Sequence, residues 1–204
     1  MYYKTVTLSY AGNGASSGSV SSHTGTVYWA PAGTVGAKMT LKSNGFSRAD
    51  AAVSLSWGGD GNAGGNATES YAFNGWNLGA AGASVTITSD TTASAQWRKS
   101  KLYIKFHNGT GINLPWSADS WTTVNLSGLS TMSVSTSTWT RDGCDEPDWR
   151  IYLGGSHVMT IGGNSSGAVS TGGRGSCQLR LNHPEVWYND GYSHGDSTVY
   201  LTFT

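Results

Sequence analysis

The sequence predicts an all-β protein, and three observations support that prediction. Apolar residues recur at every second position, glycine-rich turn segments separate these stretches at short intervals, and the spacing of an amphipathic helix is almost absent. Only Ser47 to Ala52 suggests a single helical turn, with Ser47 as its cap.

The expected strands follow one another along the chain with the same alternation. The first places Val6, Leu8 and Tyr10 on one face. Three later segments repeat the pattern between Ser, Thr, Lys or Arg residues: Leu102-Ile104-Phe106, Cys177-Leu179-Leu181 and Val199-Leu201-Phe203. Because successive side chains of a strand point to opposite faces, we expect half-buried antiparallel strands.

A cluster of positive charge from Arg98 to Lys101 lies between two of these strand patterns. It divides the chain into two predicted domains, residues 1–99 and residues 100–204. Strand lengths and turn spacing in the second domain favour an antiparallel β-sandwich of about seven or eight strands, jelly-roll-like in its architecture.

Composition excludes several classes of function. Charged residues make up 12% of the chain, about half the usual share, and its 29 glycines are about twice the usual number. The formal net charge of +0 gives no electrostatic footprint for nucleic acid, and no apolar run approaches the ~18 residues of a membrane span. The amino terminus lacks the apolar stretch of a secretory signal, so we expect the chain not to direct its own secretion.

Motifs for common cofactors are also missing from the sequence. The five histidines have no His-Glu-x-x-His or paired Cys-x-x-Cys context, and there is no Walker loop, dinucleotide fingerprint or Gly-x-Ser-x-Gly elbow. We therefore expect no resident cofactor, with calcium as the one candidate considered below.

Three aromatic segments of the first domain carry a family resemblance: Tyr10-Ala11-Gly12-Asn13-Gly14, Tyr71-Ala72-Phe73-Asn74-Gly75-Trp76 and Ala95-Gln96-Trp97. Their order and spacing resemble the Listeria–Bacteroides repeat, also known from the B repeats of internalin-type surface proteins. The sequence departs from that family by an insertion from Gly58 to Thr68 and by lacking the usual Gly-Tyr before the aromatic segment.

The resemblance implies a small β-grasp-like module over roughly residues 4–98. Proteins of this family are mostly spacers or adhesive modules on Gram-positive surfaces, and similar modules occur in phage tail and baseplate proteins. No catalytic residue is carried over. The residues themselves indicate that glycine lets Trp76 fold back on the sheet and that Trp97 closes the same core.

Tryptophan is the most prominent candidate for ligand binding, because indole faces stack on sugar C–H surfaces as well as filling cores. The chain has nine tryptophans. Four of them occur near turns or among Ser and Thr residues and are the candidate ligand-binding residues: Trp116, Trp121, Trp139 and Trp149. The alternative for each is a place in the core or in a subunit interface.

Four carboxylates within seven residues form a candidate calcium loop: Asp142, Asp145, Glu146 and Asp148. Ca²⁺ favours such hard oxygen ligands. The alternative is a solvated acidic loop neutralised by Arg141 and Arg150. The two carboxyl groups of a glycosidase face each other across a cleft, and carboxylates crowded into one loop seldom do. Glu185 is the alternative source of a second carboxyl, but the sequence does not place it. We therefore expect no enzymatic activity.

Cys144 and Cys177 are the only thiols and allow a single intrachain disulfide. Cys177 shares parity with Leu179 and Leu181, so a buried free thiol is the alternative.

Together these observations predict a non-enzymatic protein of a phage virion, at the tail tip, baseplate, fibre or head surface. It would attach to the host surface by binding a carbohydrate, and would have other virion proteins as partners. A homo-oligomer is expected because unpaired strand edges need covering. A purely structural virion subunit and a fragment of a Gram-positive surface adhesin are the alternatives, the latter located on the bacterial surface.

Overall fold

The computed structural model describes residues 2–59, 63–108, 116–137, 149–186 and 197–204. The described residues form strands and turns and contain no helix, so the predicted all-β class is confirmed. The expected helical turn from Ser47 to Ala52 is wrong, since this segment joins the end of β6 (Phe46–Ser47) to the start of β7 (Ala51–Val53).

The chain divides into two compact units. The first consists of Met1–Asp50 and Tyr71–Arg98, and the second of Ala51–Ser70 and Lys99–Thr204. One boundary falls between Arg98 and Lys99, close to the position of the basic cluster. The prediction of a continuous first domain is wrong for residues 51–70, which fold with the second unit.

The first unit is built on a mixed sheet with β1 (Tyr2–Ala11) at its centre. β1 pairs antiparallel with β3 (His23–Ala30) and parallel with the first part of β10 (Thr91–Asn108). The parallel pair was not expected, and the β-grasp-like assignment stays a prediction. The remaining strands of this unit are β4 (Gly33–Val35) on β3, the pair β2 (Ser17–Gly18) and β6, and the pair β5 (Ala37–Thr40) and β9 (Ser84–Ile87).

Trp76 lies in the core of the first unit and organises it. It is the last residue of β8 (Ala63–Trp76), and it follows Gly75, whose φ of 95° is accessible mainly to glycine. Its ring packs edge-on against Tyr10 and Phe73, with centroids 4.8 and 5.0 Å away. Trp97 packs on Phe73 and donates its indole N–H to the carbonyl of Gly12 at 2.9 Å. Trp76 is buried in the core as predicted, and Trp97 is partly buried and packs against that core.

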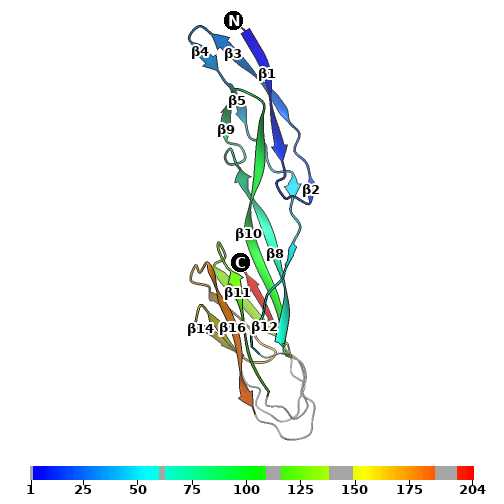
Figure 1. The fold of residues 1–204 in the computed structure, drawn as a ribbon, viewed down its shortest axis with the longest axis vertical. Helices are drawn as coiled ribbons and strands as arrows, with labels where there is room; N and C mark the ends of the chain where they lie inside the picture. Colours follow the sequence, from blue (N-terminus) through cyan, green and yellow to red (C-terminus); the bar gives the residue numbers. More distant parts are fainter. Residues whose placement is uncertain (1, 60–62, 109–115, 138–148, 187–196) are drawn as a thin grey trace. The chain divides into compact units, whose positions relative to one another are not determined.

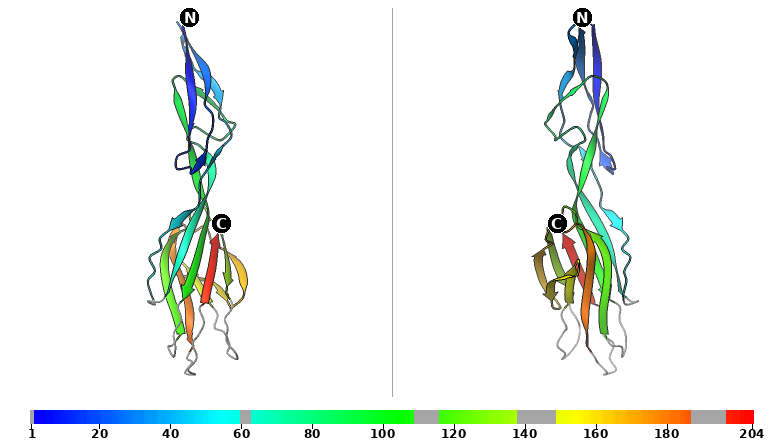
Figure 2. Two further views of the ribbon diagram at one scale, coloured as in Figure 1. Left: turned by 90° about the vertical axis from the view of Figure 1, so that its right-hand side faces the viewer. Right: turned by 60° about the vertical axis from the view of Figure 1, so that its left-hand side comes forward.

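The second unit is a β-sandwich, as predicted. One sheet has the order β15–β12–β17–β10 and continues through β8 and β7, and the other has the order β11–β16–β13–β14 (Figures 1 and 2). β8 and β7 precede residue 100, where the predicted second domain begins, yet they belong to this sandwich. The bounds not yet given are β11 (Trp116–Asn125), β12 (Thr131–Thr136), β13 (Trp149–Leu153), β14 (Ser156–Ile161), β15 (Ser166–Ser170), β16 (Ser176–Val186) and β17 (Ser197–Phe203).

The sandwich core comes from the alternating residues that the sequence singled out. β10 and β17 pair antiparallel, which sets Leu102 opposite Phe203 and Ile104 opposite Leu201, all of them buried. In the first unit β10 buries Ala93 and Ala95, at odd positions, whereas in the second it buries even positions. The basic cluster therefore lies where the buried positions of β10 change from odd-numbered to even-numbered residues.

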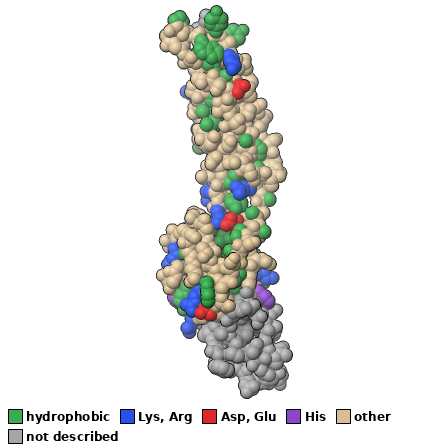
Figure 3. Space-filling model, in the orientation of Figure 1, with side chains coloured by type: hydrophobic (Ala, Val, Ile, Leu, Met, Phe, Trp, Pro, Cys, Tyr) green, Lys and Arg blue, Asp and Glu red, His purple; other side chains and the backbone are tan. Residues whose placement is uncertain are grey.

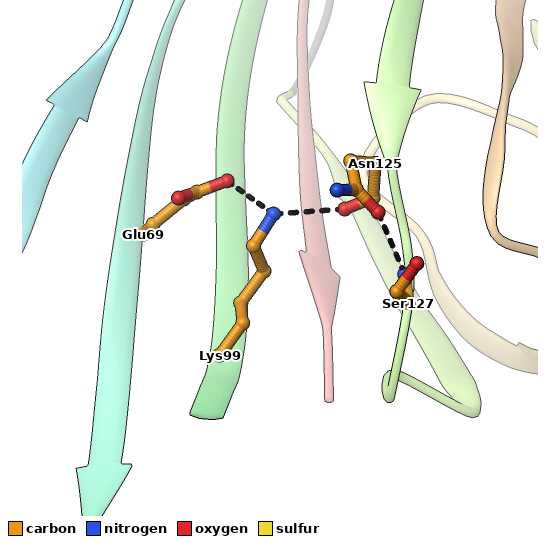
Figure 4. Close-up of polar contacts among 4 residues, drawn as sticks. All are labelled: Glu69, Lys99, Asn125 and Ser127. Carbon is orange, nitrogen blue, oxygen red and sulfur yellow. Dashed lines mark hydrogen bonds and ion pairs between the residues drawn. The ribbon is translucent and has the colours of Figure 1, made fainter. Parts of the chain in front are cut away.

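Lys99 connects the two sheets of the sandwich. Its ammonium forms an ion pair with the carboxylate of Glu69 on β8 and donates to the main-chain carbonyl of Asn125 at 2.9 Å (Figure 4). The side chain of Asn125 in turn accepts a hydrogen bond from the N–H of Ser127 at 3.0 Å, which fixes the turn after β11. The side chains of Lys99 and Glu69 are only 13% and 18% exposed.

Replacing Lys99 by methionine should destabilise the second unit by about 1–3 kcal/mol, because a largely buried carboxylate and a carbonyl lose a charged donor. Chemical denaturation followed by circular dichroism measures the change. Lys101→Met on the same strand is the matched control and should change stability by less than about 0.5 kcal/mol. Equal effects of the two substitutions would contradict a connecting role for Lys99.

Candidate functional site

The outward face of the four-stranded sheet carries a row of large polar and aromatic side chains. Trp121 on β11 is paired in register with Arg180 on β16, Arg180 with Tyr152 on β13, and Tyr152 with His157 on β14. We call these four residues the outer row. Their strand neighbours Thr122, Leu179, Leu181, Ile151 and Leu153 are buried beneath them.

Arg180 is the most firmly held member of the outer row. Its Nε and Nη2 donate to the two carboxylate oxygens of Asp119 at 2.6 and 2.7 Å, a bidentate arrangement that fixes the plane of the guanidinium. The guanidinium carbon also lies 5.3 Å from the centre of the Tyr152 ring. Hydrogen bonding to Asp119 raises the pKa of Arg180, so the guanidinium stays charged.

Among the described residues of this face, Trp121 is the large hydrophobic side chain that is exposed, with 40% of its surface accessible. Its main chain pairs with Gly58 through two hydrogen bonds of 2.8 and 3.0 Å. A Cβ on Gly58 would lie only 2.5 Å from the indole Nε1, so a glycine at this position lets the ring lie against the backbone. One edge of the indole is therefore supported while the remainder is accessible.

A β-bulge sets the position of the last two members of the outer row. The pairing of β13 and β14 shifts between Ile151 and Tyr152, which places Tyr152 opposite His157. The two rings meet edge-on with centroids 5.3 Å apart, and the His157 ring nitrogen Nε2 lies 2.9 Å from Thr160 Oγ1. The outer row thus crosses all four strands of the sheet.

The charges beside the outer row include the Arg180–Asp119 pair and Arg150, which is exposed on the same face of β13. Figure 3 shows one face of the molecule, on which uncharged polar side chains and backbone predominate and charged atoms form small groups. Arg180 and Asp119 neutralise one another, so this pair adds no net charge to the outer row.

Of the four predicted ligand-binding tryptophans, the structure supports one and corrects another. Trp121 is exposed in the outer row. Trp149 is fully buried and packs edge-on against Phe106 at 5.7 Å, so its prediction as an exposed platform is wrong. Trp149 begins β13 with the inward parity of Ile151 and Leu153. Trp116 begins β11, but its side chain lies outside the described part of the structure. Trp139 lies outside the described residues.

The predicted calcium ligands Asp142, Asp145, Glu146 and Asp148 all lie outside the described residues, so the calcium site stays a prediction. Elsewhere, the described ranges contain no cluster of three or more His, Cys, Asp or Glu side chains suited to a metal ion. Nor does any helix able to cross a membrane occur in the part of the chain that the structure describes.

Cys177 has a free, half-buried thiol, and burial raises its pKa. Its predicted partner Cys144 lies outside the described residues, so the disulfide is not confirmed.

Sequence reasoning missed Asp119, Arg180, Tyr152 and His157 as site residues. Their parity was available, because Arg180 alternates with Leu179 and Leu181 and must point away from the core. The register that joins Arg180 to residues 28 positions away on β13 and 59 away on β11 depends on pairing between distant strands, which local patterns do not specify.

Comparison with known proteins assigns no family. No family model matches the chain, and no curated protein matches its sequence. Among solved structures it is similar to the CBM36-1 domain of a multidomain xylanase from the hindgut metagenome of Trinervitermes trinervoides, at 13% identity and a TM-score of 0.32, covering 76% of this chain and 97% of that domain. It is also similar to the secreted serine protease VesC from Vibrio cholerae, at 9% identity and a TM-score of 0.32, covering 78% of this chain. The chain spans 45% of the length of VesC. At these scores neither similarity bears on what this chain does.

Proposed function

We propose that this chain is a non-enzymatic recognition protein that binds carbohydrate through the outer row. The observation that carries the proposal is the exposed indole of Trp121 in register with a guanidinium that Asp119 holds in place. Because sugars present apolar C–H faces beside hydroxyl groups, they match an aromatic ring flanked by fixed polar groups. Few side chains need to be ordered on binding, which favours affinity.

The paired charges of Arg180 and Asp119 suit the hydroxyl groups of a sugar. Arg180 donates to Asp119, and the pair together offers N–H donors and carboxylate acceptors of the kind that hydroxyl groups use. Tyr152 extends the surface beyond Arg180. The row is open and follows the sheet, so a chain of sugars fits better than a monosaccharide that needs enclosure.

A binding role is favoured over catalysis by the number of carboxylates. Glycoside hydrolysis uses two carboxyl groups facing each other across the scissile bond. Among the described residues of the outer face, Asp119 is the carboxylate beside the row, and it is already engaged by Arg180. This arrangement suits holding a glycan rather than cleaving it.

The biological setting that we propose is a phage virion whose exposed protein attaches to the host surface. The resemblance of the first unit to the Listeria–Bacteroides repeat and the weakly charged surface support this setting. The partners would be other virion proteins and a host-surface glycan, and the chain would act as a homo-oligomer. A structural virion subunit or a surface adhesin fragment would be the alternative if no glycan binds.

The experiment is a binding assay of the purified protein on cell-wall fragments and capsular polysaccharides from candidate Gram-positive hosts. We expect saturable binding that Trp121→Ala weakens at least about tenfold, since removal of a central aromatic anchor typically costs 2 kcal/mol or more. Tyr28→Ala is the matched control, because Tyr28 of the first unit is 41% exposed and should leave binding unchanged. Circular dichroism checks that both variants are folded.

Two further arms make the assay decisive. Arg180→Gln should weaken binding through loss of the charged donor, and a chelator tests the predicted calcium loop from Asp142 to Asp148. Binding that survives both Trp121→Ala and Arg180→Gln would place the site elsewhere. Absence of binding to every polysaccharide would reject carbohydrate recognition and favour the structural subunit.

A further inference from the structure

A second feature of the molecule is a hollow in the first unit, between the start of β3 and the segment that contains β5. It has a volume of about 460 Å³, and its lining includes His23, Lys38 and Lys42. We call it the anion hollow. No carboxylate is among its lining residues as far as the structure describes them.

The charge of the first unit favours an anionic ligand. Residues 1–50 and 71–98 contain five lysine or arginine side chains and two aspartates, a net charge of +3. The second unit has seven basic and ten acidic side chains, a net charge of −3. The formal net charge of +0 of the whole chain is therefore the sum of two units of opposite charge, and the positive first unit attracts anions.

Lys42 is held in place by its main chain and its side chain. Its backbone N–H donates to the hydroxyl of Tyr10 at 2.9 Å, and its carbonyl accepts the indole N–H of Trp76 at 2.9 Å. Its ammonium donates to the carbonyl and hydroxyl oxygens of Ser21 at 2.9 and 2.8 Å. Because an ammonium has three donors, one N–H is left for a ligand.

His23 supplies a second, independent observation. Its Nε2 atom is buried and has no hydrogen-bond partner among the described residues. The ring is held edge-on against Tyr10, with centroids 6.0 Å apart. Burial, and after it the positive charge of Lys42, lowers the pKa of His23. A buried ring nitrogen without a partner is unfavourable, and in the tautomer that carries the proton on Nε2 this atom has an N–H for a ligand to accept.

We propose that the anion hollow binds an oxyanion group, a phosphate or a carboxylate, through Lys42, Lys38 and His23. Lys42 Nζ and His23 Nε2 donate to the anion, and the exposed Lys38 adds positive charge at the rim. The inference is separate from carbohydrate binding by the outer row, because it involves a different unit and a different chemistry. It gives the first unit a binding role of its own.

The test is a titration of the full chain with inorganic phosphate, followed by the imidazole resonances of His23 in nuclear magnetic resonance spectra. The His23 signals are assigned from their loss in His23→Gln, and sodium chloride at equal ionic strength is the reference. We expect a saturable shift with phosphate, and at least about fivefold weaker binding in Lys42→Gln, since charge-assisted hydrogen bonds to anions are the stronger kind. Lys38→Gln should weaken binding less.

Matched variants and ligands decide the outcome. Lys101→Gln makes the same charge change in the second unit and should leave the affinity within about twofold, since Lys101 is not among the residues that line the anion hollow. Glycerol 3-phosphate carries a phosphate group and glucuronate a carboxylate. The one that binds more tightly identifies which of the two groups the anion hollow prefers. A shift that chloride reproduces would overturn the proposal, and so would unchanged binding in Lys38→Gln together with Lys42→Gln. Because Lys38 is exposed, its variant remains informative even if Lys42→Gln does not fold.

Discussion

Replacing Trp149 by alanine is expected to destabilise the second unit by about 3–5 kcal/mol, the usual cost of truncating a fully buried aromatic side chain. Trp149 has no exposed surface and packs on Phe106, which itself contacts Trp57 with ring centroids 4.7 Å apart. The truncation would therefore open a cavity at the centre of the sandwich. Denaturant unfolding followed by circular dichroism measures the loss.

Trp121→Ala is the comparison that gives this result its meaning. Its indole is partly exposed, so the expected cost is less than about 2 kcal/mol, while glycan binding should weaken at least about tenfold. Trp149→Ala should thus lower mainly the stability of the second unit, whereas Trp121→Ala should lower mainly its glycan binding. If both substitutions lowered the free energy of unfolding by similarly small amounts, the buried position of Trp149 would be contradicted. If Trp149→Ala stayed folded and lost glycan binding while Trp121→Ala kept it, Trp149 would belong to the ligand site.

The sequence predicted the elements of the fold whose evidence is local. Alternation identified Leu102, Ile104 and Phe106 as one buried face, and that face pairs in register with Val199, Leu201 and Phe203. The glycine before Trp76 and the aromatic residues around it indicated the core of the first unit. In each case the signal lies within a few residues of the position it describes.

Long-range pairing explains what the sequence did not predict. The parallel contact of β1 with β10 joins Leu8 to Thr91, and no pattern within either strand specifies it. The segment from residues 51 to 70 folds with the second unit because β7 pairs with β8, for example at Ala51 and Glu69, and β8 pairs with β10. The stretch from Gly58 to Thr68 lies within this segment.

The candidate site was predictable only in part for the same reason. Trp121 could be proposed from its residue type and its polar neighbours, whereas its partners come from three other strands. Trp149 has the same residue type in a similarly polar stretch, and only the inward parity it shares with Ile151 and Leu153 distinguishes it. Residue type alone therefore predicts too many ligand-binding tryptophans, and the burial of each side chain shows which of them can reach a ligand.

Gly59→Ala is expected to disrupt both the stability and the binding surface of the second unit. Gly59 has a φ of 105°, and a Cβ there would lie 1.9 Å from the carbonyl oxygen of Asp119 and 2.9 Å from the Cα of Ser120. Both obstacles are backbone atoms of β11, so no side-chain rotation relieves the overlap. Strain and displacement together should cost about 2–4 kcal/mol.

The same displacement should weaken glycan binding although every side chain of the outer row remains. Moving residue 59 away from β11 breaks the hydrogen bonds between Gly58 and Trp121, which support the indole, and shifts Asp119, which holds Arg180. Gly64→Ala is the matched control, since a Cβ there meets nothing within 4 Å. Thermal unfolding and the polysaccharide assay measure the two effects. If Gly59→Ala matched Gly64→Ala in both, the close approach of this segment to β11 would not be what positions the outer row.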